Sequence, residues 1–431
     1  MLTWLKWLYP GMGIKRWLTM GLLGTVIITV GFGFLVPGLV ERISEIAPKG
    51  IPNWLAGATL LVVGFIIAGY GLWRAFSTVV GELSRDDDDS VVDLIYKRRY
   101  LQKGPKIVVI GGGTGLSTLL KGLKEYTSNI TAIVAVTDDG GSSGRLRDEL
   151  GILPPGDIRN CLVALADKES LMEHVLQYRF KGGEMAGHSL GNLFIAALSD
   201  LSGGFYGGVQ ALSKVLAIRG QVLPSTLENV VIGARFSDGA VVRGECSLAA
   251  RGKKIKNIFL EPENCQPLPQ ALKALEEADA IVLGPGSVYT SVIPNLLVAG
   301  IPEAIKNSYA LKVYVCNVMT QPGETKDFTA SDHLKAIQQH GGQLVDHIIV
   351  NKGLIPKHLV KRYQQEEASP VVADISKLRS MGVKVVAEDL VLETDVVRHH
   401  SQKLARAILK LIFANKTPAE RKKFIQDYSK E

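Results

Sequence analysis

A glycine-rich turn follows the apolar run at residues 106–111, and its residue types suit ligand binding. The turn contains Gly112, Gly113, Thr114 and Gly115. Glycines let a ligand approach the backbone closely, and free N–H groups at a helix start attract phosphate. The turn lacks the lysine of a Walker A loop, and Leu116 stands where the dinucleotide fingerprint has its third glycine. We therefore predict a phosphate-binding turn and keep an NAD site as an alternative.

A second stretch, "TDDGGSSGR", places two carboxylates before small residues and an arginine. Its candidate ligand-binding residues are Asp138, Asp139, Ser142, Ser143 and Arg145. Carboxylate oxygens are the ligands that Mg²⁺ prefers, and arginine forms charge-assisted hydrogen bonds with phosphate. The pattern favours Mg²⁺ on Asp138 and Asp139 beside a phosphate group. Two alternatives stay open: the acids cap the next helix, or Asp138 binds the ribose of NAD.

Two further stretches place polar residues at helix starts. In "PPGDIRN", Asp157 is either an N-cap or a site residue, and Arg159 and Asn160 follow it. In "GHSLGN", His188 and Asn192 are four residues apart and share one helix face. His188 is either structural or an acid, base or phosphate contact. We assign no catalytic residue and keep Asp138, Asp157 and His188 as candidates.

A third loop, "GPGSVYTS", follows another apolar run. It offers backbone amides at Gly286, hydroxyls at Ser287 and Thr290, and at Tyr289 a ring that can stack on a base or sugar. Three loops of this kind are more specific than one. Together they predict a cleft for a phosphorylated ligand, either a nucleotide or a nucleotide sugar.

Five apolar, β-rich runs must position these loops. They span residues 106–111, 130–137, 278–286, 312–318 and 346–351. Runs of this kind indicate a parallel sheet covered by helices, in which ligands bind beyond the carboxyl ends of the strands. Residues 156–218 have a helical period and predict a helical insertion. The expected class is α/β, with a Rossmann-like, mostly parallel sheet.

Two later segments complete the expected domain. Residues 229–245 predict a hairpin with Asp238 and Gly239 as its turn. Residues 401–416 form an amphipathic pattern and predict a helix packed on the sheet. We expect His399 and His400, just before that helix, to lie on the surface.

The N-terminal part predicts two transmembrane helices. Residues 17–40 and 51–73 contain no charged residue, and each stretch reaches the roughly 20 apolar residues that a span needs. Lysines and arginines precede the first stretch and follow the second, so we expect both termini in the cytoplasm. All five tryptophans lie in residues 1–73, which suits side chains anchored at the headgroup level. We expect a multi-pass protein of the plasma (inner) membrane.

The predicted organisation has three parts: a membrane hairpin at residues 1–82, a charged linker at 83–103 with four consecutive aspartates, and an α/β domain at 104–431. The net charge of +7 is scattered, without a basic block, so we expect no nucleic-acid partner.

Six motifs extend over nearly all of the chain after the linker. They are "GGGTGLSTLLKGL", "AVTDDGGSSGRLR", "PPGDIRNCLVALA", "HSLGNLFIAAL", "GPGSVYTSVIPNLLVAGI" and "CNVMTQPGET". In this order they closely resemble the CofD-like superfamily and its bacterial gluconeogenesis factor (YvcK-type) branch.

The resemblance implies a fold related to 2-phospho-L-lactate transferase, a Mg²⁺-dependent enzyme that uses a nucleotide-activated donor. For the gluconeogenesis factor branch it implies binding of a UDP-sugar, notably UDP-N-acetylglucosamine, and a role in gluconeogenic growth, cell shape and wall synthesis. By resemblance, the first glycine turn lines the phosphate side, Asp138 and Asp157 are metal or polar contacts, and Ser287 and Tyr289 belong to the nucleotide-sugar pocket. The "HSLGNL" and "MTQPGET" segments resemble this branch and not the transferase proper.

The leading hypothesis is therefore a membrane-tethered cytoplasmic UDP-sugar sensor. A Mg²⁺-dependent transferase of a phospho group is the second hypothesis, an NAD-dependent oxidoreductase the third and a scaffold the fourth. We expect no tightly bound organic cofactor. The expected partners are the nucleotide ligand, the membrane and further copies of the chain in a homo-oligomer.

Overall fold

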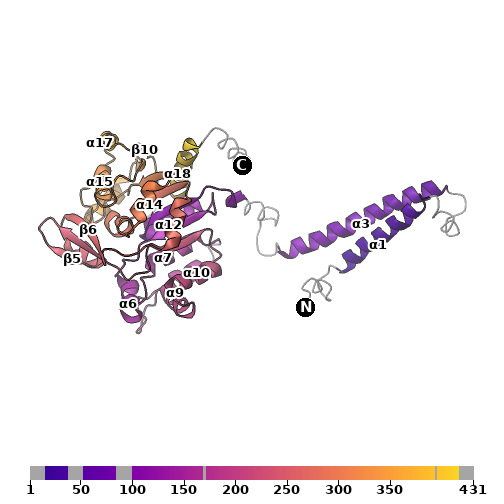
Figure 1. The fold of residues 1–431 in the computed structure, drawn as a ribbon, viewed down its shortest axis with the longest axis horizontal. Helices are drawn as coiled ribbons and strands as arrows, with labels where there is room; N and C mark the ends of the chain where they lie inside the picture. The colour runs from indigo at the N-terminus through magenta and orange to yellow at the C-terminus, as the bar shows by residue number, and fades with distance from the viewer. Residues whose placement is uncertain (1–14, 37–51, 84–99, 168–170, 394–395, 417–431) are drawn as a thin grey trace. The chain divides into compact units, whose positions relative to one another are not determined.

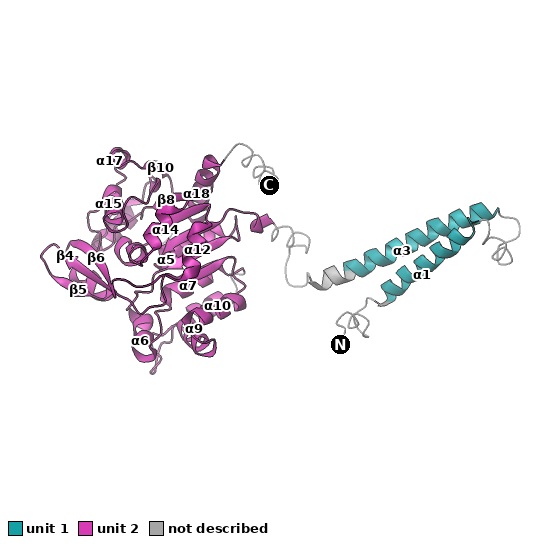
Figure 2. Cartoon of the chain, viewed as in Figure 1, with its two compact units in different colours: residues 1–99 teal, residues 100–431 magenta. Residues whose placement is uncertain are grey.

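The computed structural model describes residues 15–36, 52–83, 100–167, 171–393 and 396–416. The chain divides into two compact units, residues 1–99 and 100–431 (Figure 2). The predicted acidic linker run falls in residues 84–99, outside the described residues. Folded structure in the second unit begins at Tyr100, and Leu101 is already buried.

The first unit contains two antiparallel helices, α1 (Lys15–Gly33) and α3 (Asn53–Leu83). They pack through small residues: a Cβ on Gly24 would lie 2.4 Å from the backbone nitrogen of Ala68. Both helices are long and apolar enough to cross a membrane, through residues 16–33 and 53–77. The first helix ends at Gly33, earlier than the predicted span, and the second extends beyond its predicted end.

The second unit is built on a seven-stranded parallel sheet with the order β10-β9-β8-β7-β1-β2-β3 (Figure 1). The five predicted runs all form strands of this sheet. They are β1 (Ile107–Gly111), β2 (Ile130–Val134), β7 (Ala280–Leu283), β8 (Leu311–Val315) and β9 (His347–Asn351). The predicted Rossmann-like α/β class is confirmed.

The strand order has a switch point at the centre of the sheet. The chain moves outward from β1 through β2 to β3, and then returns to place β7 on the other side of β1. Ile107 pairs with Ile130 on one side and with Ala280 on the other. The connections after β1 and β7 therefore diverge, and the gap between them is where open α/β sheets bind ligands.

Two strands of the sheet were not predicted. β3 (Gln221–Pro224) has four residues and ends in proline, and β10 (Lys384–Glu388) is a half-exposed edge strand. Neither has the long, fully apolar run of a central strand.

The predicted helical insertion is present between β2 and β3. It contains α6 (Gly141–Leu150), α7 (Gly156–Leu165), α8 (Leu171–Gln177), α9 (Leu190–Leu201) and α10 (Phe205–Val215). Helix α5 (Gly113–Leu123) follows β1 and packs against α7 and, on another side, against the C-terminal helix α18 (Ser401–Asn415). The predicted amphipathic helix is therefore confirmed.

A small antiparallel sheet follows the insertion. The predicted hairpin is β4 (Val231–Phe236) and β5 (Val241–Arg243), and β6 (Ile255–Glu261) pairs with the free side of β4. Helix α11 (Glu245–Arg251) connects β5 to β6. The remaining helices are α12 (Pro269–Glu276), α13 (Ile293–Leu296), α14 (Ile301–Asn307), α15 (Ala330–Gly341), α16 (Lys357–Gln365) and α17 (Ile375–Ser380).

The hairpin of β11 (Val391–Glu393) and β12 (Val397–His399) precedes α18. His399 is only 6% exposed, and its Nε2 lies 3.2 Å from the carbonyl oxygen of Cys316. The prediction of a surface position for His399 was wrong, because β12 carries this side chain inward. His400 is half-buried at the N-cap of α18.

Candidate functional site

A cleft of about 390 Å³ lies at the carboxyl ends of β1 and β7, at the switch point of the sheet. Its walls come from the loops after β1, β7 and β8, from the N-termini of α7 and α11, and from β12. The predicted residues that line it are Gly112, Gly113, Thr114, Gly115, Asp138, Asp157, Gly286, Ser287 and Thr290. The fold thus unites the first and third predicted loops with two candidate acids.

The first and third loops touch through backbone atoms. A Cβ on Gly115 would lie 2.8 Å from the carbonyl oxygen of Pro285 and 3.0 Å from the nitrogen of Gly286. Asn317 holds the far side of the third loop, because its Oδ1 accepts from the Gly286 N–H at 3.1 Å and its Nδ2 donates to the Gly286 carbonyl at 2.8 Å. Glycine at position 115 is therefore required by close packing of the two loops.

The N-terminus of α5 contacts a carboxylate at the wall of the cleft. The Gly113 N–H hydrogen-bonds to Asp157, and a Cβ on Gly112 would lie 2.4 Å from an Asp157 oxygen. Burial and the nearby Asp138 charge raise the pKa of Asp157 to about 6, although this N–H and Arg159 oppose the rise. The N-terminus of α5 thus already holds one carboxylate, that of Asp157.

Two further acids near the cleft were not predicted from the sequence. Glu245, at the start of α11, lines it, and burial together with Asp138, Asp157 and Glu324 raises the pKa of Glu245 to about 9. Glu324 lies behind the third loop, where its carboxylate accepts hydrogen bonds from Ser287 and Thr290. Burial raises the pKa of Glu324 to about 7. Near pH 7, Glu245 is therefore protonated and can donate a hydrogen bond into the cleft.

A smaller cavity of about 280 Å³ adjoins the cleft. Asp138 and Asp157 line both spaces and form their common wall. The other predicted residues that line the smaller cavity are Ser142, Ser143, Arg159, Asn160 and Asn192. The second predicted loop and the helical insertion therefore form a neighbouring subsite.

Arg159 is the central side chain of this subsite and is 7% exposed. Its Nη1 donates to Ser189 Oγ and, at 2.8 Å, to Asn192 Oδ1, while Nη2 donates to Asn160 Oδ1 at 2.8 Å. Burial and the nearby Arg179 lower the pKa of Arg159. Its Nε has no hydrogen-bond partner among the described residues. Arg159 and Arg179 line this cavity together with Asp138 and Asp157, so its lining carries charges of both signs and suits a polar group.

Ser142, which lines this subsite, forms a pair with His188. The Oγ of Ser142 lies 3.1 Å from His188 Nδ1 and accepts from Asn192 Nδ2 at 3.1 Å. Both side chains are at most 4% exposed, and His188 lines neither cavity. Burial, followed by the Arg145 charge, lowers the pKa of His188. These contacts order the second loop.

Three predicted residues point elsewhere. Asp139 accepts the N–H of Cys246 at 2.9 Å, so it caps α11 and lines neither cavity. Arg145 donates to the carbonyl of Ala186 at 2.6 Å. Tyr289 lies in the π-helix η2 (Val288–Val292) and faces a different cavity, away from Ser287 and Thr290.

The acids fit Mg²⁺ only in part. Within the described ranges, no group of three or more His, Cys, Asp or Glu side chains is arranged to hold a metal ion. Mg²⁺ is commonly held by one or two carboxylates together with substrate phosphates. Asp138 and Asp157 suit that arrangement, whereas Asp139 is engaged by α11. Bound Mg²⁺ would neutralise phosphate charge at this wall.

Residues missed by sequence reasoning also line the cleft. They are Glu245, Asn317, Gln321, Arg398 and His399. Asn317 and Gln321 follow β8, so the rule that sites lie beyond strand ends could have found them. Glu245 comes from helix α11 and Arg398 from strand β12, and no local sequence pattern connects either element to the cleft.

The comparisons with known proteins show the family of the chain. Residues 107–391 match the family described as 2-phospho-L-lactate transferase CofD. The chain belongs to the CofD family. Its CofD-type region resembles a crystal structure of a UPF0052 member from Bacillus halodurans, with a TM-score of 0.70, 52% identity, and coverage of 71% of this chain and 99% of that chain.

Two CofD-family relatives differ in how much of the chain they match. A Nostoc sp. protein is 46% identical over 424 residues, covering 94% of this chain and 92% of its own. A Bacillus subtilis protein named "Gluconeogenesis factor" is 51% identical over 311 residues, covering 72% of this chain and 98% of its own. This similarity supports the gluconeogenesis factor branch.

Proposed function

We propose that the cleft binds a UDP-sugar, with UDP-N-acetylglucosamine as the ligand. The protein then acts as a sensor that regulates carbon flow, cell shape and cell-wall synthesis during gluconeogenic growth. The observation that carries this proposal is the junction of the α5 N-terminus, the third loop and the arginine-containing subsite at one switch point. In this proposal the cleft takes the diphosphate, and the adjoining subsite takes the sugar.

Regulation is favoured over catalysis by what lines the cleft. In the part of the chain that the structure describes, no serine or cysteine of the cleft has a histidine as a hydrogen-bonded base. Ser142, which lines the adjoining subsite, pairs with His188, but both side chains are buried and His188 lines neither cavity. The name of the Bacillus subtilis relative points in the same direction.

A Mg²⁺-dependent transferase of a phospho group is the second candidate. The specific observation in its favour is the wall shared by the two cavities, since Asp138 and Asp157 line both. Mg²⁺ on these acids would let a nucleotide-activated donor in one cavity face an acceptor in the other.

The proposed location is the plasma membrane, with both termini and the α/β unit in the cytoplasm. The two apolar helices support the anchor, and the basic flanks support the orientation. We also propose a homo-oligomer held in the plane of the membrane.

Calorimetry on the full chain in detergent tests the proposed ligand. UDP-N-acetylglucosamine, GDP and NAD are titrated with and without Mg²⁺. Arg398 is exposed and lines the cleft, so Arg398→Ala should weaken UDP-sugar binding at least tenfold. Arg379, exposed on α17, lines none of the cavities described here and gives the matched control Arg379→Ala.

The outcomes separate the candidates. Selective binding of UDP-N-acetylglucosamine that only Arg398→Ala weakens supports the proposal. Equal affinity for all three nucleotides, or no detectable binding of the UDP-sugar, contradicts it. Turnover of a nucleotide-activated donor with Mg²⁺ would establish the transferase instead.

A further inference from the structure

A second cavity, of about 800 Å³, lies next to the cleft but shares none of its lining residues. Its walls come from the start of β6, from the segment before α15, from α15 and from η2. The π-helix separates the two spaces: Ser287 and Thr290 face the cleft, and Tyr289 faces the second cavity. Its size is in the range of small-molecule sites, and π-helical turns are frequent at functional sites.

The walls of this cavity are held in place by hydrogen bonds. Gln339 on α15 donates to the carbonyl of Lys256 at 2.8 Å, and His340 Nε2 accepts the N–H of Ile258 at 2.9 Å. The rings of Tyr289 and Phe328 meet edge to face with centroids 6.1 Å apart. The cavity is therefore a preformed space with an aromatic wall.

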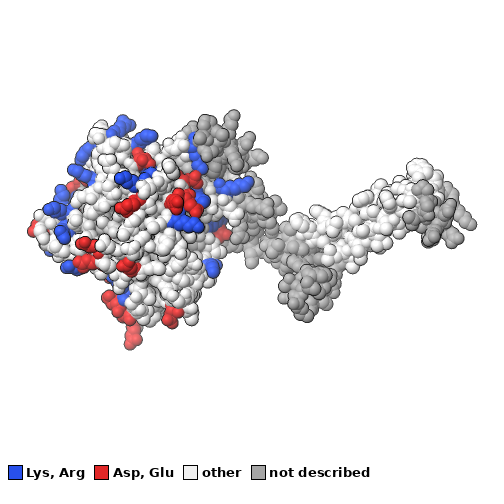
Figure 3. All heavy atoms as spheres, in the orientation of Figure 1, with Lys and Arg blue, Asp and Glu red and all other residues white. Residues whose placement is uncertain are grey.

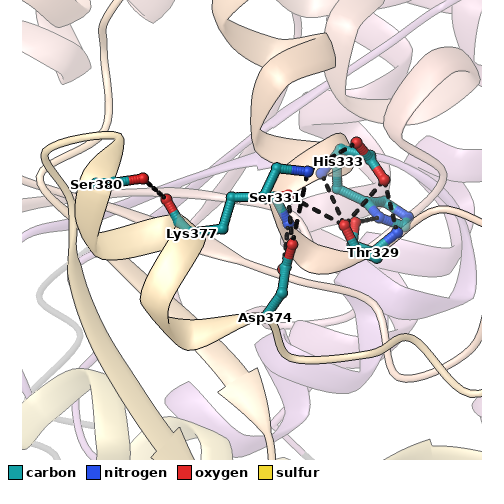
Figure 4. Close-up of polar contacts among 7 residues, drawn as sticks. Thr329, Ser331, His333, Asp374, Lys377 and Ser380 are labelled. Atoms are coloured by element: carbon teal, nitrogen blue, oxygen red, sulfur yellow. Dashed lines mark hydrogen bonds and ion pairs between the residues drawn. The ribbon is translucent and has the colours of Figure 1, made fainter.

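The N-terminus of α15 is also fixed (Figure 4). Asp374 accepts from the N–H of Ser331 at 2.9 Å and from its hydroxyl at 2.5 Å. Thr329 and Asp332 form a capping box, in which the Asp332 carboxylate accepts from the Thr329 N–H at 3.1 Å. These bonds already engage Asp332, which lines the cavity.

Five lysines line the cavity, namely Lys253, Lys254, Lys256, Lys326 and Lys335. Figure 3 shows lysine and arginine atoms gathered on the side of the α/β unit that carries β5, β6 and α15. Lys326 pairs with Glu367 at 3.4 Å. The other four have no ion pair with a described residue.

The acids around the cavity offset this charge only in part. Glu367 pairs with Lys326, and Asp332 lies 3.6 Å from Lys377, which is outside the cavity lining. Burial raises the pKa of Glu324 to about 7, so its carboxylate is only partly ionised near pH 7. Asp327 is the remaining carboxylate of the lining. Six lysines, Lys377 included, thus stand against four carboxylates, and the net positive charge attracts anions.

We propose that this cavity is a second ligand site, which binds a small phosphate-bearing molecule. The lysines supply charge-assisted hydrogen bonds to phosphate oxygens, and Tyr289 and Phe328 contact the less polar part of the ligand. The two spaces share no lining residue, and they are connected through Glu324, which lines this cavity and accepts hydrogen bonds from Ser287 and Thr290 of the cleft.

Inorganic pyrophosphate is the probe, titrated into the full chain in detergent at fixed ionic strength without Mg²⁺. The test variant is the double substitution Lys254→Ala and Lys335→Ala, which removes charge from two opposite elements of the wall. The control is Lys214→Ala with Lys273→Ala, two exposed lysines outside the cavity that change the net charge equally. All four side chains are exposed, so the variants should fold.

The expected result is pyrophosphate binding that weakens at least tenfold in the Lys254/Lys335 variant and is unchanged in the control. Arg398→Ala, in the cleft, should leave this binding in place, and the Lys254/Lys335 variant should keep its affinity for UDP-N-acetylglucosamine. The proposal is overturned by equal weakening in both lysine pairs, by binding that only Arg398→Ala removes, or by no binding at all. The UDP-N-acetylglucosamine titration tests the cleft alone, so loss of UDP-sugar binding with pyrophosphate binding retained, or the reverse, shows which of the two proposals fails.

Discussion

Replacing Gly115 with alanine tests the contact between the first and third loops. The added Cβ would lie 2.8 Å and 3.0 Å from two backbone atoms of the third loop, which Asn317 holds in place. Because the facing atoms belong to the backbone and cannot turn aside, this overpacking should cost about 3 kcal/mol, and the higher helix propensity of alanine offsets about 1 kcal/mol of it. We expect a net loss of about 2 kcal/mol in the free energy of unfolding. The affinity for the ligand should also fall, because the third loop must move to make room for the added Cβ.

All four cysteines lie in the α/β unit, and three of them, Cys161, Cys265 and Cys316, are buried. Thermal unfolding of the full chain can therefore be followed with a thiol-reactive fluorogenic maleimide, which reports on this unit alone. We expect Gly115→Ala to lower Tm by roughly 3 °C, because a unit of this size shifts by roughly 1.4 °C per kcal/mol. Gly182→Ala is the control, because no atom lies within 4 Å of its added Cβ. A Gly115→Ala protein with the Tm and UDP-sugar affinity of the wild type would refute the described loop contact.

Three further predictions concern the subsite, the buried histidine and the hairpin. Arg159→Ala removes a buried guanidinium that is hydrogen-bonded to three side-chain oxygens, so the free energy of unfolding should fall by about 3 kcal/mol in the same thermal assay. Arg145→Ala, which removes a bond to one carbonyl, should lower it by less than about 1 kcal/mol. Burial lowers the pKa of His399 to about 4, below its unfolded value of about 6.5, so its stabilisation is lost as pH falls through this window. In urea unfolding followed by circular dichroism, the free energy of unfolding of the wild type should therefore fall by about 2 kcal/mol more than that of His399→Gln between pH 7 and pH 5. Equal decreases in the two proteins would contradict this prediction. In Gly24→Leu, the two apolar helices should separate at a lower SDS concentration than in the wild type, measured by tryptophan fluorescence. Gly69→Leu should behave like the wild type, because no atom lies within 4 Å of a Cβ at that position.

The central sheet could be predicted because its middle strands are continuous apolar runs buried on both faces. β3 and β10 lack that signal, since one is four residues long and the other is a half-exposed edge. The ends of α1 and α3 differ from the predicted spans because composition locates apolar stretches better than helix termini.

The candidate site was predictable where its residues directly follow strands of the main sheet. Glu245 and Arg398 reach the cleft from α11 and β12, through tertiary contacts that one sequence does not show. Tyr289 was expected beside Ser287, but the π-helical turn directs the two side chains into different cavities. His399 was expected at the surface because it lies beside an amphipathic helix, yet it is buried near the Cys316 carbonyl.

The most direct test of the central claim is an experimental structure of the full chain with UDP-N-acetylglucosamine. The account predicts density for the diphosphate at the N-terminus of α5, between Gly113 and the third loop, with the sugar toward Asp157 and the arginine-containing subsite. Density for the nucleotide sugar only in the lysine-lined cavity, or in neither space at saturating ligand, would contradict it.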